Sequence, residues 1–101
     1  MEVLAKGSER KLTLALRGEL DHHAAKEVMT RLERELDLSL PLFLTLDFSG
    51  VTFMDSSGIA VALRAQRAML ALGGQAELTN VPPQAKKVFD AAGIARFISV
   101  R

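Results

Sequence analysis

The sequence predicts a small α/β protein, with four or five strands in a mixed β-sheet and about three α-helices packed against it. Segments with the two-residue period of strands alternate along the chain with segments that have the period of a helix. The connections between these segments are short, as in a compact α/β domain. A chain of 101 residues, 49% of them hydrophobic, can build one core. We therefore expect a single domain over residues 1–101.

The first predicted elements are two strands and a helix. Leu12, Leu14 and Leu16 alternate with polar or small residues, which is the period of a half-buried strand. A shorter strand over residues 2–5 is expected to pair with it across the turn-prone segment 6–9. From Asp21 onward the period becomes helical, and five residues form one apolar face. These are Ala25, Val28, Met29, Leu32 and Leu36.

The middle of the chain predicts a central strand followed by a second helix. Residues 42–48 are apolar at almost every position, which favours a strand covered on both faces. We expect Ser49-Gly50 to break this strand. Residues 51–54 then lead into a polar turn and a helix that extends to about Leu72, and Gly73-Gly74 end that helix.

The last third of the chain predicts a strand, a helix and a final strand. Residues 75–81 have a strand pattern, and Pro82-Pro83 start a third helix. Gly93 is expected to end this helix, and residues 97–100 to form the last strand. The inner face of the helix is predicted to consist of Ala85, Val88, Phe89 and Ala92.

Composition argues against several classes of partner. The five aromatic residues are all Phe and the formal net charge is +1, so neither stacking platforms nor a basic field favour nucleic acid. The absence of cysteine excludes a disulfide scaffold and a thiolate zinc site and is consistent with a reducing cytoplasm. Residues 1–6 lack the features of a secretory signal. The most apolar stretch, 59–72, is too short to span a bilayer and contains Arg64 and Arg67. We therefore expect a cytoplasmic protein without a membrane or nucleic-acid partner.

A polar island, Asp55-Ser56-Ser57-Gly58, separates a strongly apolar strand from a strongly apolar helix. Asp or Ser at a helix start can simply cap free backbone N–H groups, at about 1 kcal/mol. One capping side chain suffices, however, and here three hydroxyl or carboxylate groups stand in a row before a small glycine. The island is therefore a candidate functional site as well as a candidate cap.

The second helix carries its few polar residues on one strip. Ala60, Arg64, Arg67 and Ala71 share this strip on a helical wheel, next to the polar turn. Small residues and arginines beside such a turn are typical of a docking surface. The alternative, that both arginines are merely exposed to solvent, remains open.

Catalytic, metal and nucleotide sites are not indicated by the sequence. Ser56 and Ser57 lack the Gly-x-Ser-x-Gly elbow of the α/β-hydrolases. His22-His23 have no third nitrogen or sulfur ligand for a metal, and exposed polar residues in a first helical turn explain them. No glycine-rich phosphate loop is present. We therefore expect no enzyme, no metal and no cofactor, with a small nucleotide-binding or hydrolysing protein as a weaker alternative.

Two stretches, 17–25 (RGELDHHAA) and 47–59 (DFSGVTFMDSSGI), resemble the signatures of the anti-sigma factor antagonists, whose fold is the STAS domain. Gly73-Gly74 and residues 83–94 match the later pattern of that family, so the resemblance covers essentially the whole chain. The Asp-Ser-Ser-Gly turn is typical of antagonist-type STAS domains in general, and Leu-Asp-His-His narrows the resemblance to the sporulation branch. Family members usually continue past the last strand into a final helix, whereas this chain stops at Arg101.

The resemblance implies a phosphorylation switch at Ser56. In that family the first serine after the aspartate is phosphorylated by an anti-sigma factor that is also an ATP-dependent serine kinase, of the SpoIIAB type. The unphosphorylated antagonist binds this kinase and frees the sigma factor, and a serine phosphatase resets it. The residues expected to face the partner are Asp21, His22, Asp55, Ser56, Ser57, Gly58, Ala60, Arg64 and Arg67. The alternative function is a STAS subunit of a membrane transport or lipid-trafficking complex.

Overall fold

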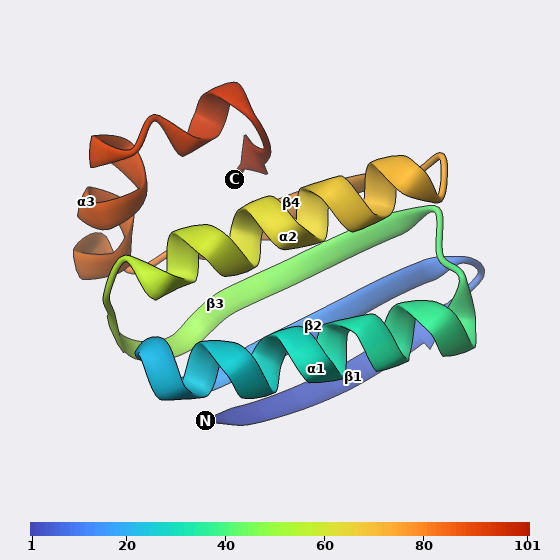
Figure 1. The fold of residues 1–101 in the computed structure, drawn as a ribbon, viewed down its shortest axis with the longest axis horizontal. Helices are drawn as coiled ribbons and strands as arrows, with labels where there is room; N and C mark the ends of the chain where they lie inside the picture. The colour runs from blue at the N-terminus through green and yellow to red at the C-terminus, as the bar shows by residue number, and fades with distance from the viewer.

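The computed structural model describes all of residues 1–101 and contains five strands, three α-helices and one short 3₁₀ helix (Figure 1). This five-stranded mixed sheet with three helices confirms the predicted fold class. The strands are β1 (Glu2–Ser8), β2 (Lys11–Leu20), β3 (Phe43–Met54), β4 (Gln75–Thr79) and β5 (Ser99–Val100). The helices are α1 (His22–Ser39), α2 (Ser57–Ala71), α3 (Pro83–Ala91) and the 3₁₀ helix η1 (Ile94–Arg96).

The strands lie in the sheet in the order in which they occur in the chain, β1-β2-β3-β4-β5. β1 is antiparallel to β2, and all other neighbours are parallel. Crossovers between parallel strands are right-handed, so crossovers that all advance in the same direction place their helices on the same face of the sheet. Accordingly α1 and α2 lie side by side on one face, with their N-terminal ends at the same edge of the molecule (Figure 1).

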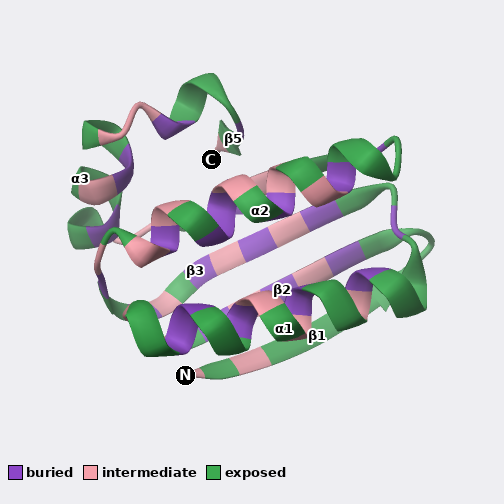
Figure 2. Cartoon of the chain, viewed as in Figure 1, coloured by how far each residue is buried: buried purple, intermediate pink, exposed green.

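The second face of the sheet carries no helix, which corrects one prediction. On β3, Leu46 and Phe48 point toward the helices and are fully buried. Phe43 lies on the other face and is 51% exposed, while Thr45 and Asp47 on the same face are half-buried. Buried and intermediate bands accordingly alternate along β3 (Figure 2). The prediction that this strand is covered on both faces is therefore wrong. Its apolar run gave no indication that all crossovers lie on one side.

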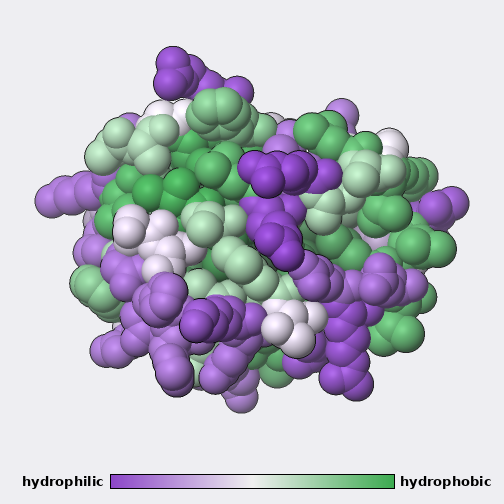
Figure 3. Space-filling view, in the orientation of Figure 1, coloured by the Kyte–Doolittle hydropathy of each residue, from purple (hydrophilic) through white to green (hydrophobic).

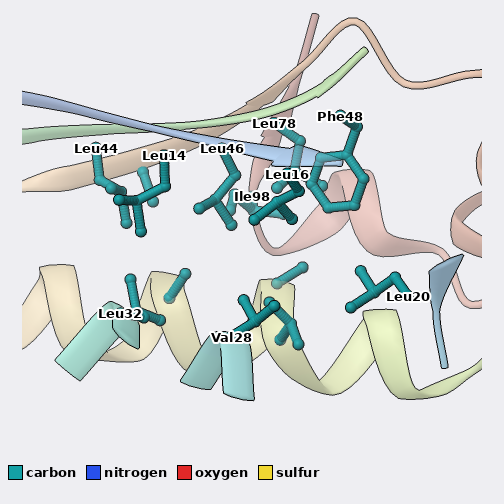
Figure 4. Close-up of a cluster of buried hydrophobic side chains, with 14 of the residues drawn as sticks. Leu14, Leu16, Leu20, Val28, Leu32, Leu44, Leu46, Phe48, Leu78 and Ile98 are labelled. Atoms are coloured by element: carbon teal, nitrogen blue, oxygen red, sulfur yellow. The ribbon is translucent and has the colours of Figure 1, made fainter. Parts of the chain in front are cut away.

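The core fills the space between the sheet and the two long helices (Figure 4). It contains 24 buried hydrophobic residues and no buried polar or charged residue. Leu14, Leu16 and Leu46 from the sheet face Val28 and Leu32 of α1. A second contact attaches α3, because the rings of Phe48 and Phe89 meet edge to face with their centroids 5.4 Å apart.

The turn between the first two strands lies later than predicted. β1 continues through Gly7 and Ser8, which pair with Leu12 and Lys11. The chain reverses at Glu9 and Arg10, both of which have positive φ, 49° and 66°. The predicted turn over residues 6–9 is wrong because Gly7 occupies a strand position, and its turn-forming tendency is overridden by pairing with β2.

Ser49-Gly50 do not break the central strand, contrary to the prediction. β3 continues to Met54, and two register shifts against β2 absorb the irregularity. A side chain at Gly50 would collide with β2, because its Cβ would lie 2.8 Å from the carbonyl oxygen of Leu16. The glycine here permits close approach of two strands at a bulge.

The end of the chain is also more irregular than predicted. Asn80 adopts the left-handed conformation and ends β4 at Thr79, ahead of the predicted boundary. Gly93, with φ 65°, ends the third helical segment as predicted. After the η1 turn, Phe97 and Ile98 are irregular where the predicted last strand should begin, so β5 is only two residues long. None of the helices is long and apolar enough to cross a membrane.

Candidate functional site

The site begins at Asp21, where β2 passes into α1. The carboxylate of Asp21 accepts a hydrogen bond of 2.9 Å from the backbone N–H of Ala24, and its carbonyl oxygen accepts one of 2.9 Å from Ala25. The residue has extended backbone geometry and is half-buried. Asp21 is therefore the N-cap of α1.

A second acidic residue, Asp55, organises the start of α2. Its Oδ1 accepts a hydrogen bond of 2.8 Å from the N–H of Ser57, and its carbonyl oxygen accepts one of 3.1 Å from Gly58. This side-chain bond to the backbone two residues later is an Asx turn. Asp55 thus caps the helix, although Ser56 is the residue that directly precedes it.

Ser56 is left without a structural task. It is exposed, already has helical backbone angles (φ −62°, ψ −15°), and its side chain caps no backbone N–H group. Ser57 is half-buried at the first helical position. Of the two hydroxyls, that of Ser56 is therefore the one presented to solvent at the positive end of the α2 dipole.

The N-terminal ends of α1 and α2 converge on the Asp55 carboxylate. The backbone N–H of Ser57 is the main reason why the pKa of Asp55 lies below its ordinary value of 3.8. The backbone N–H and the imidazole of His22, from the start of α1, lower this pKa further. Asp21, His22, Asp55 and Ser56 are thus brought to one edge of the molecule, and their role as a shared partner-binding site stays a prediction.

Gly58 lies beneath this edge and is buried. A Cβ at this position would overlap the side chain of Met54, which is itself fully buried. The glycine allows the first turn of α2 to sit directly on the last residue of β3. Its predicted contact with a partner stays a prediction, since its role in this structure is to pack the turn.

The predicted strip on α2 extends away from the turn along the exposed side of the helix. Ala60, Arg64 and Arg67 are all exposed. Arg64 forms an ion pair of 2.5 Å with Glu33 of α1, so its positive charge is paired within the protein. Arg67 forms no ion pair. In the upper half of Figure 3 hydrophobic colour lies on either side of a strongly hydrophilic group over the middle of α2, while the lower half, over α1, is mostly hydrophilic.

Two residues near the site were not singled out from the sequence. The side-chain amide of Gln84, on α3, forms two hydrogen bonds of 2.8 Å with the backbone of Met54. Phe53, next to Met54, is 45% exposed beside the turn. A glutamine in a first helical turn and a phenylalanine in a strand are common features, so no sequence signal distinguished either residue.

The geometry does not suggest a metal site. No group of three or more His, Cys, Asp or Glu side chains is close enough together to hold an ion. His22 and His23 are both exposed in the first turn of α1. What the arrangement can do is present one free hydroxyl, beside a carboxylate, on a surface built from two helix starts.

Comparison with known proteins identifies the family. The family model of the STAS domain matches residues 2–101. The chain belongs to the STAS domain family. A curated relative, an anti-sigma F factor antagonist of Lysinibacillus sphaericus, is 31% identical over 83 residues, covering 82% of this chain and 71% of the relative.

Solved structures agree with this assignment. The anti-sigma factor antagonist SpoIIAA in its unphosphorylated form superposes on this STAS domain with a TM-score of 0.84 at 27% identity, covering 99% of this chain and 88% of the other. The Bacillus cell fate determinant SpoIIAA in the phosphorylated form gives a TM-score of 0.74, also at 27% identity, covering 99% and 91%. The fold of this STAS domain is therefore shared with both forms of SpoIIAA.

The lowered pKa of Asp55 predicts a specific dependence of stability on pH. A carboxylate whose pKa is lower in the folded state stabilises the protein fully above its unfolded pKa, and this stabilisation is lost as the pH falls through the folded pKa. Asp55→Asn keeps a side-chain oxygen for Ser57 but removes the titration. Wild type should therefore lose its advantage over Asp55→Asn as the pH falls below about 4.

Urea unfolding of both proteins at pH 7, 4 and 3 measures this difference. Asp47, whose pKa is also lowered, titrates in both proteins and cancels in the comparison. A difference in unfolding free energy that stays constant from pH 7 to pH 3 would contradict the interactions described for Asp55.

Proposed function

We propose that this STAS domain is an anti-sigma factor antagonist whose binding is switched by phosphorylation of Ser56. In the unphosphorylated form it binds an anti-sigma factor that is also a serine kinase, and this binding releases the sigma factor. Phosphorylation of Ser56 ends the binding, and a serine phosphatase restores it. The family assignment and the name of the curated relative, an anti-sigma F factor antagonist, support this proposal.

The observation that carries the proposal is the division of roles between Asp55 and Ser56. Asp55 makes the capping hydrogen bond, while the hydroxyl of Ser56 is exposed and caps nothing. A hydroxyl that holds no structural bond can be modified without breaking one. Modification of this residue therefore leaves the start of α2 intact.

The local electrostatics explain how a phosphate would act. The positive end of the α2 dipole stabilises an anion at Ser56 by roughly 0.3–1 kcal/mol at an exposed position. The phosphate adds about −1.5 to −2 charge units next to the carboxylate of Asp55. A partner surface that fits a bare hydroxyl then meets both bulk and negative charge, while the fold of the antagonist is retained.

The partner-facing surface follows from the same geometry. It comprises the converging starts of α1 and α2 and continues along α2 through Ala60, Arg64 and Arg67. In this proposal the domain is a substrate of its kinase and phosphatase, catalyses nothing itself, and works in the cytoplasm where its partners act. The exposure of Ala60, Arg64 and Arg67 supports a docking role for this strip.

One prediction of this function concerns the residue that is phosphorylated. Incubation with ATP and the anti-sigma factor kinase of the same organism should add a single phosphate at Ser56, because Ser57 is half-buried at the first helical position. Mass spectrometry of the digested product locates the phosphate, with Ser56→Ala as the matched control. Phosphate on Ser57 in the wild-type protein would show that the assignment of the switch residue is wrong.

Another prediction concerns the contribution of Asp21 to partner binding. Asn caps a helix about as well as Asp, so Asp21→Asn should keep the hydrogen bond to Ala24 and a nearly unchanged melting temperature. We expect affinity for the anti-sigma factor to fall about tenfold, because the lost charge faces a cationic group of the partner. Calorimetry measures the affinity. Glu27→Gln, which removes an exposed charge nearly two turns further along α1, is the control and should bind like wild type. Equal affinity of Asp21→Asn and wild type for the anti-sigma factor would show that Asp21 acts only as a helix cap.

A further inference from the structure

The strand that leads to Ser56 extends beyond its neighbour on one side. β3 pairs with β4 only from Phe43–Gln75 to Asp47–Thr79. Residues 48–54 of β3 therefore run past the end of β4 and pair with β2 alone. The backbone groups at the end of β3 that point away from β2 need another partner.

Gln84 supplies that partner at the last residue of the strand. Its Nε2 donates a hydrogen bond of 2.8 Å to the carbonyl oxygen of Met54, and its Oε1 accepts one of 2.8 Å from the N–H of Met54. A primary amide carries one donor and one acceptor side by side, as a peptide group of a neighbouring strand does. The side chain of Gln84 thus continues the ladder that β4 leaves unfinished.

This contact fixes the start of the turn from both sides. The N–H of Asp55, directly after Met54, donates a hydrogen bond of 3.3 Å to the carbonyl oxygen of Leu20 on β2. Met54 is therefore bonded to α3 and Asp55 to β2, and Asp55 lies two residues before Ser57, the first residue of α2. Ser56 has no side-chain hydrogen bond of its own to the helix. Its position depends on these two anchors of the preceding backbone.

The anchor on α3 is itself held independently of Gln84. The ring of Phe89 packs against Phe48, and Ala85 and Phe89 are almost completely buried. Gln84 is largely exposed apart from its contact with Met54. Replacing Gln84 therefore removes the two hydrogen bonds while α3 remains packed.

We propose that Gln84 is a positioning residue that holds the Asp55-Ser56 turn in the geometry required for phosphoryl transfer. The inference rests on the proposed function, because it assigns Gln84 a role in the phosphorylation of Ser56. A small displacement of a reacting group can lower a rate greatly while binding is little affected. Loss of the Gln84 contact should therefore act on kcat rather than on KM.

The test compares Gln84→Met and Gln84→Glu with wild type. Gln84→Met keeps the length of the side chain and loses both hydrogen bonds, whereas Gln84→Glu keeps the acceptor for Met54 N–H and loses the donor. With ATP and the anti-sigma factor kinase of the same organism, Gln84→Met should lower kcat about tenfold with KM within about twofold. Gln84→Glu should lie between Gln84→Met and wild type.

Two controls separate positioning from a general loss of stability. Lys87→Ala changes an exposed residue on the same helix that makes no ion pair, and should match wild type. Phe89→Leu weakens the packing of α3 and should lower the melting temperature at least as much as Gln84→Met, with kcat little changed. Equal losses of kcat in Phe89→Leu and Gln84→Met would overturn the positioning role.

A measurement without the kinase separates this inference from the proposed function. Amide hydrogen exchange of Met54 should be at least about tenfold faster in Gln84→Met than in wild type, with the amides paired between β2 and β3 unchanged. Unchanged exchange at Met54 would overturn the inference even if Ser56 is phosphorylated normally. If wild type is not phosphorylated at all, the proposed function fails, and the exchange result alone decides whether Gln84 anchors the turn.

Discussion

The parallel pairing of β2 with β3 is the constraint on which the site depends. The register runs from Lys11–Phe43 to Leu20–Met54, so the two strands end side by side. Because each strand is followed directly by its helix, α1 and α2 must also begin side by side. Asp21 and Asp55 stand at these two ends, one at the start of each helix. The shared edge formed by the two helix starts is thus a consequence of strand register.

Two register shifts between β2 and β3 change the local geometry of this strand pair. They occur after Ala15 and after Gly18 on β2, in the half of the ladder nearest the site. Each inserts a residue into β3 relative to β2, which increases the local twist of the pair. Gly50 permits one of these irregularities because no side chain stands between the strands there. β4 ends at Thr79, before the residues of β3 that follow the first shift, so the end of β3 runs past β4 and Met54 bonds to Gln84 instead.

Most of the fold could be predicted from the sequence because its signals are local. The helical period after Asp21, the polar island at Ser56 and the double glycine after α2 each depend on a few neighbouring residues. The open face of the sheet could not be predicted, since burial on β3 depends on which side every crossover takes. The continuation of β3 through Ser49-Gly50 likewise depends on bulges against a distant strand.

The same distinction applies to the site. Asp21, Asp55 and Ser56 were predicted because their residue types and spacing match a known turn and a known family. The capping role of Asp55, which leaves Ser56 free, needed the geometry, because any of three adjacent polar side chains could have made that bond. Gln84 was missed because its partner, the backbone of Met54, is 30 residues away in the chain.

Affinity for the anti-sigma factor across substitutions at Ser56 tests the switch most directly. Ser56→Ala loses no capping bond, so it should fold as wild type does, bind the partner with wild-type affinity and escape phosphorylation. Ser56→Glu should also fold, because a carboxylate is favourable at a helix start. It should bind at least about tenfold more weakly, since it places charge and bulk beside Asp55. Calorimetry gives the affinities, and circular dichroism confirms that both variants are folded. Equal affinity of folded Ser56→Glu and Ser56→Ala would contradict a switch that acts by blocking this surface.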